Sequence, residues 1–192
     1  MLPHYAQAFY QSPPVVFNRQ LRRYSLGHDF LLDAAGNPLV CGGIPSIDDL
    51  TLAVHVCGLG FREALDFARN PKTEEFQAWA HSCVKLDFKA EIAKFWDYLS
   101  DGRTVPPRKV STDSKPHKCP WQLVVAAAIC GSESMTPGRM SEIMDMPLSE
   151  ALVWNAARRE SLGDDTLASE EEWQIVQMGK QLAKGKGNVG TS

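Results

Sequence analysis

The sequence lacks the apolar run that a membrane span requires. A transmembrane helix needs about 20 consecutive apolar residues, and the longest apolar stretch here, Leu123 to Cys130, is far shorter. The first residues also lack the basic patch and the apolar stretch of a signal peptide. We therefore expect no membrane insertion and a location in the cytoplasm.

Closely paired cysteines are missing as well. The five cysteines are odd in number and widely scattered, at Cys41, Cys57, Cys83, Cys119 and Cys130. This spacing argues against a disulfide framework. Three of them occur in a His-x-Cys pattern, the residue types that zinc prefers. Residues two apart on a helix point about 200° apart, so the pairs at 55/57 and 81/83 cannot chelate one ion. The loop pair 117/119 would need partners from elsewhere, and we expect no metal and no cofactor.

There is no excess of charge of one sign. The net charge is −3, from 20 basic and 23 acidic residues, whereas proteins that hold nucleic acid by its phosphates usually show a basic excess. Residues 136–162 predict two short helices that are superficially like a helix-turn-helix. The basic pair Arg158 and Arg159 follows at the end of the second helix, and Glu150 occupies its base-reading half. The balanced charge therefore argues against nucleic-acid binding, and a small DNA-binding regulator is kept as an alternative function.

Catalytic motifs are absent too. The sequence holds no phosphate-binding loop of the form GxxxxGK[ST], no HExxH, no GxSxG and no CxxC. Gly58-Leu-Gly60 lacks the third glycine of a nucleotide loop and is interpreted as a helix break. His28 could act as a base, but no nucleophile can be assigned to it. We predict that the protein is not an enzyme.

Helix signals are present along most of the chain and predict an all-α fold. Capping residues or helix-starting prolines precede periodic apolar stretches at Ser25, Ser46, Thr73, Pro120, Thr136, Pro147 and Ser169. The predicted organisation is an irregular N-terminal arm (1–24) that includes a short strand at 15–17, a compact helical unit (25–102), a linker (103–119), a C-terminal helical unit (120–184) and a disordered tail (185–192). The linker is rich in proline and basic residues, and is either a solvated connector or a tether for nucleic acid or an acidic partner.

The clearest amphipathic pattern covers residues 87–99. Its apolar residues, which we call the stripe, recur at helical spacing and are Phe88, Ile92, Phe95, Trp96 and Leu99. Such an aromatic stripe is usually part of a core. The alternative is a groove that takes an apolar helix from a partner, together with the neighbouring Trp79, because five large apolar side chains exceed what one helix contact must bury.

Two segments resemble proteins of tailed-phage structural gene clusters. Residues 21–32 (LRRYSLGHDFLL) resemble an N-terminal pattern of small helical proteins encoded there. Pro120-Trp121 with its apolar helix, followed by Met146-Pro-Leu-Ser-Glu-Ala-Leu-Val-Trp154, resembles phage tail assembly chaperones. The chain is longer at its N-terminus than the compact members of that family, and a frameshift-derived extension is not identifiable.

That resemblance implies a non-enzymatic chaperone for the apolar tape-measure protein, or for another tail protein, acting in the host cytoplasm during virion morphogenesis. A structural component of the virion itself, such as a neck or tail-completion protein, is the first alternative. Self-association into a homo-oligomer stays open.

Overall fold

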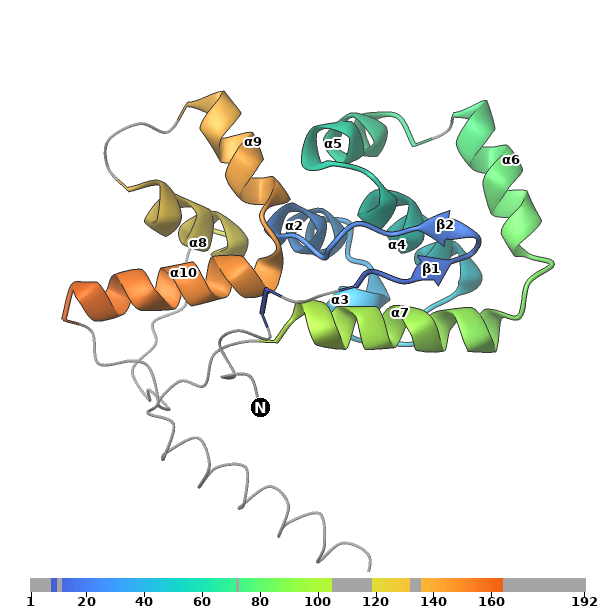
Figure 1. Cartoon of the computed structure of the whole chain (residues 1–192). Coiled ribbons are helices and arrows are strands. Elements are labelled where there is room, and N and C mark those ends of the chain that lie inside the picture. The colour runs from blue at the N-terminus through green and yellow to red at the C-terminus, as the bar shows by residue number, and fades with distance from the viewer. Residues whose placement is uncertain (1–7, 10–11, 72, 105–118, 132–135, 164–192) are drawn as a thin grey trace, which may run out of the picture.

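A computed structural model of the chain describes residues 8–9, 12–71, 73–104, 119–131 and 136–163. This part is all-α apart from one two-stranded hairpin, as the sequence predicts (Figure 1). The helices are α2 (Leu26–Ala34), α3 (Pro38–Cys41), α4 (Ile47–Gly58), α5 (Phe61–Arg69), α6 (Glu74–Cys83), α7 (Phe88–Gly102), α8 (Trp121–Cys130), α9 (Pro137–Asp145) and α10 (Leu148–Ser161). None of these helices is long and apolar enough to cross a membrane.

The helices begin where the capping residues predict. The hydroxyl groups of Ser25, Ser46 and Thr73 each accept a hydrogen bond from a backbone N–H in the first turn of α2, α4 and α6. These bonds satisfy donors that the helix itself leaves unpaired. Among the helices of the described residues, the one-turn helix α3 is the one that the sequence interpretation missed. Asn37 caps it and Pro38 occupies its first position, so the residues that end one helix also start the next.

The expected irregular arm is in part a component of the core. Strands β1 (Val15–Val16) and β2 (Arg19–Gln20) form an antiparallel hairpin, and Val16, Phe17, Leu21 and Tyr24 are buried. Its turn is tight, because Phe17 and Asn18 both adopt positive φ angles of 48° and 57°. These apolar residues of the predicted arm are buried because α4 and α7 pack on the hairpin.

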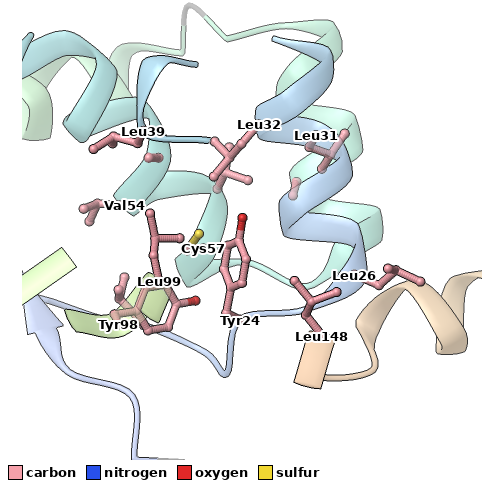
Figure 2. Packing of buried hydrophobic residues seen from close by; sticks show 14 of the residues in the cluster. Tyr24, Leu26, Leu31, Leu32, Leu39, Val54, Cys57, Tyr98, Leu99 and Leu148 are labelled. Carbon is pink, nitrogen blue, oxygen red and sulfur yellow. The ribbon is translucent and has the colours of Figure 1, made fainter. Parts of the chain in front are cut away.

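Helix α2 lies at the centre of the molecule and joins its two halves. It packs against α3, α4 and α5 on one side and against α8, α9 and α10 on the other (Figure 1). The backbone N–H groups of Leu26 and Leu148 donate to the carbonyls of Met146 and Tyr24, at 3.0 and 2.7 Å. The two predicted helical units therefore share one continuous core, in which Leu148 of α10 lies beside Tyr24 and Leu26 (Figure 2).

A buried polar cluster also holds the halves together. The Asp29 carboxylate on α2 is 1% exposed and accepts hydrogen bonds from Tyr24, Arg103 and Gln122 at 2.7–2.8 Å. Arg103, which the sequence assigned to the linker, is thus anchored to the core. Residues 105–118 of the predicted linker, the helix predicted at 169–184 and the tail at 185–192 lie outside the described residues.

Candidate docking surface

The apolar stripe of α7 faces mainly inward. Phe95 and Leu99 are 0% and 2% exposed, and Phe88 and Ile92 are half-buried against the same core. The hairpin and α4 cover this side of α7, and the backbone N–H of Phe17 donates to the Glu91 carboxylate at 2.6 Å. The sequence analysis counted more apolar side chains on this helix than one helix contact can bury. The hairpin and α4, which are distant in sequence, bury most of them. Phe95 and Leu99 are not available to a partner in this structure.

The remaining two candidate residues differ in exposure. Trp79 is half-buried, and its indole N–H donates to the carbonyl of Phe17 at 3.3 Å. Trp96 is 42% exposed. Of the six residues proposed from the sequence, Trp96 is therefore the one with a large surface open to solvent.

A different apolar surface lies between α8 and α10. A groove of about 420 Å³ is lined there by the apolar residues Ile129, Met146, Trp154 and Ala157 and by the polar residues Arg158 and Ser161, which we call its rim. Trp154 is 53% exposed. A large exposed aromatic side chain beside other apolar groups is typical of a protein-binding surface.

The helical periodicity of α10 explains why Trp154 points outward. Leu148, Ala151, Leu152 and Ala156 are buried on one side of the helix. At 100° per residue, Trp154 falls on the opposite side. The resemblance to tail chaperones includes this tryptophan. Its place opposite the inward residues of α10 is a signal that the sequence interpretation did not use.

Arg158, which lines the groove, lies against Gly131 at the end of α8. Gly131, which ends α8, adopts a φ of +71°, a conformation that glycine adopts readily. A Cβ atom at this position would lie 3.1 Å from the Arg158 guanidinium. The Arg158 side chain therefore crosses from α10 to the end of α8 and places a positive charge beside an apolar groove.

The start of α10 is not open for reading bases. Leu148, Ser149 and Ala151 are at most 1% exposed, and the Ser149 hydroxyl donates to the Ala8 carbonyl at 2.8 Å. Glu150 forms an ion pair with Arg23. A recognition helix contacts base edges with its N-terminal residues, and here those residues are covered.

The candidate base His28 is bonded into the fold, whereas His117 of the loop pair lies outside the described residues. The ring of His28 accepts from Ser25 N–H through Nδ1 and donates to the Leu59 carbonyl through Nε2, and burial lowers its pKa. All five cysteines are free thiols. Within the described ranges, no three His, Cys, Asp or Glu side chains gather into a group that could hold a metal ion.

Comparison with known proteins gives no further guidance: no family model, no curated protein and no solved structure matches this chain.

Proposed function

We propose that this protein is a helical binding protein that holds an apolar helix of a partner protein in the groove between α8 and α10. The observation that carries the proposal is Trp154, more than half exposed in a groove whose other walls are Ile129, Met146 and Ala157. Amphipathic helices dock into such grooves through apolar side chains three and four residues apart. Large exposed aromatic residues supply much of the energy at such interfaces.

The positive charge of Arg158 limits which partner helices fit the groove well. Arg158 lies beside the apolar walls, so the favoured ligand is a helix with an apolar face and an acidic residue at its edge. Charge at a rim affects orientation and association rate more than affinity. The apolar face would therefore supply most of the binding energy.

The resemblance to tail assembly chaperones supports a specific partner. Its matching segments, Pro120 to the end of α8 and Met146 to Trp154, contribute groove residues from both helices. We therefore propose a phage tail assembly chaperone whose partner is the tape-measure protein or another tail protein. A virion component would use the same groove for a permanent contact. Persistence of the chain in purified particles would favour that alternative.

Co-expression tests this function. The chain should keep an apolar helical segment of a tape-measure protein soluble and co-purify with it. Trp154→Asp should abolish co-purification while leaving the melting temperature close to the wild-type value, because Trp154 is exposed. Trp96→Asp is the matched control, since Trp96 is similarly exposed on α7, and it should leave co-purification unchanged.

Equal binding by the wild type and by Trp154→Asp would contradict the proposed groove. A dimer that dissociates on Trp154→Asp, measured by light scattering, would instead assign the groove to self-association.

A further inference from the structure

A second hollow lies on the other half of the molecule, where the hairpin meets α4, α5 and α6. It has a volume of about 540 Å³, within the range of small-molecule sites. Its walls come from Arg19, His55, Phe67 and Phe76, with further polar groups at the rim from Asp66, Asn70, Thr73 and Glu75. Nothing in the proposed function uses this hollow.

Three contacts position Arg19 in the wall of this hollow. Its guanidinium carbon lies 4.1 Å from the centre of the Trp79 ring, and one of its amino groups bonds Nδ1 of His55. Its aliphatic stem lies against Gly58, where a Cβ atom would be 3.2 Å from Arg19 Cδ. A guanidinium fixed in this way loses little further freedom when it binds a ligand.

The bond to Arg19 also fixes the tautomer of His55. Arginine has only donors, so Nδ1 of His55 must accept and the ring proton resides on Nε2. Burial, followed by the positive charge of Arg19, lowers the pKa of His55 to about 4. At neutral pH the imidazole is therefore uncharged, with an N–H on Nε2 for which the described residues offer no hydrogen-bond partner.

The remaining walls are aromatic. The His55 ring lies 4.2 Å from the Phe67 ring and 4.8 Å from the Phe76 ring, centre to centre. The two phenylalanine rings are 4.9 Å apart in a T-shaped arrangement. An apolar flat group would find edges and faces of rings to pack against.

The charges around the hollow leave Arg19 without a direct counter-ion. Within the described part of the chain, no carboxylate lies within ion-pair distance of Arg19. Asp66 is already paired with Arg69 at 3.3 Å. Glu75 attracts Arg19 through space without a hydrogen bond, and it is the group with which an anionic ligand would compete.

We propose that this hollow binds a carboxylate attached to an apolar flat group. The carboxylate would accept hydrogen bonds from the N–H groups of the Arg19 guanidinium that do not bond His55, and the apolar group would pack on Phe67 and Phe76. Charge-assisted bonds from a guanidinium to a carboxylate are among the stronger hydrogen bonds in proteins. The source of the carboxylate is either a small free acid or the C-terminus of a peptide that ends in an aromatic residue.

Titration of the full chain with 3-phenylpropanoate tests the proposal, with the neutral 3-phenylpropanamide as the matched control ligand. The readout is the indole N–H resonance of Trp79, identified by its loss in Trp79→Phe. The acid should shift this resonance with saturation, and the amide should not. Tighter binding of a peptide that ends in a free Phe carboxylate would identify a chain terminus as the source, and weaker binding would identify a small acid.

We expect opposite effects on ligand affinity from two substitutions that each remove a charge. Arg19→Gln should abolish saturable binding, whereas Glu75→Gln should tighten it about two- to fivefold, because a competing carboxylate is removed. Lys89→Gln, which removes an exposed charge on α7, should change nothing. Glu75→Gln keeps the test informative even if Arg19→Gln loosens the hairpin. Equal shifts from acid and amide, no saturable shift, or weaker binding by Glu75→Gln would overturn the proposal.

Discussion

The carboxylate of Asp29 on α2 accepts a hydrogen bond from the side-chain amide of Gln122 on α8, at 2.8 Å. Both side chains are buried. The bond joins two helices that are separated in sequence by the whole predicted linker. Because Tyr24 and Arg103 donate to the same carboxylate, Asp29 is the polar centre of the contact between the two halves.

Asp29→Ala should therefore lower the free energy of unfolding by about 3 kcal/mol, since it leaves three donors without their acceptor in a buried site. Asp33→Ala is the matched control one turn later. It removes an exposed carboxylate that accepts long hydrogen bonds from Gln122 at 3.3 Å and from the exposed Cys41 thiol at 3.5 Å, and should cost less than about 0.5 kcal/mol. Urea denaturation measures both values. Equal losses would contradict a central role for Asp29.

Phe95→Ala and Trp96→Ala should differ strongly although the residues are adjacent. Phe95 is 0% exposed and Trp96 is 42% exposed. The first substitution opens a cavity and should cost about 3–5 kcal/mol, while the second should cost at most about 1 kcal/mol. Thermal or chemical denaturation of the two variants compares them directly. A cost for Trp96→Ala that approaches that for Phe95→Ala would show that Trp96 also belongs to the core.

Gly27→Ala should destabilise the protein although alanine is the better helix former. A Cβ atom at this position in α2 would overlap the Phe61 ring and lie 2.8 Å from the Met144 carbonyl oxygen. We expect a loss of about 1–3 kcal/mol from this overpacking. Gly138→Ala in α9 is the control, because nothing lies within 4 Å of its Cβ position. It should stabilise by up to about 1 kcal/mol. A stabilising Gly27→Ala would contradict the close contact of α2 with α5 and α9.

Stability should fall as the pH falls from about 6.5 towards 4. Burial lowers the pKa of His28, and burial together with the charge of Arg19 lowers the pKa of His55 to about 4, from the ordinary histidine value of 6.5. In this window the unfolded chain binds protons that the folded chain excludes, so protonation favours unfolding. The full stability is present above about pH 6.5.

The melting temperature measured against pH checks this expectation. His55→Gln keeps an acceptor for Arg19 and removes the titrating ring, so its curve should be flatter than that of the wild type. A wild-type melting temperature that is constant or rises on acidification would show that these histidines are not held neutral in the folded state.

Local signals predicted most of the helical fold. Ser25, Ser46, Thr73 and Thr136 mark the starts of four helices because a capping hydroxyl and the first-turn N–H groups are neighbours in the chain. The hairpin was predicted less well. Val16 and Phe17 are buried by α4 and α7, and no pattern within the first 24 residues indicates which distant helices will cover them.

The candidate site was predicted least well, for the same reason. Periodicity correctly placed Phe95 and Trp154 on helices, but it did not indicate which apolar face another element covers. Phe95 is enclosed because the hairpin and α4 pack on α7, while Trp154 remains exposed on α10. Likewise, the hollow at Arg19 combines four elements, and its residues show no common motif in the sequence.

The sequence by itself determined where helices begin and end, because capping, proline and periodicity act over a few neighbouring residues. Only the tertiary structure decided which apolar surfaces stay open and which polar groups meet. Burial of a side chain depends on elements brought in from elsewhere in the chain, as Asp29 meets Gln122 across the core. The stripe of α7 became mainly core and the face of Trp154 became the candidate surface because packing among distant helices covered the first and left the second exposed.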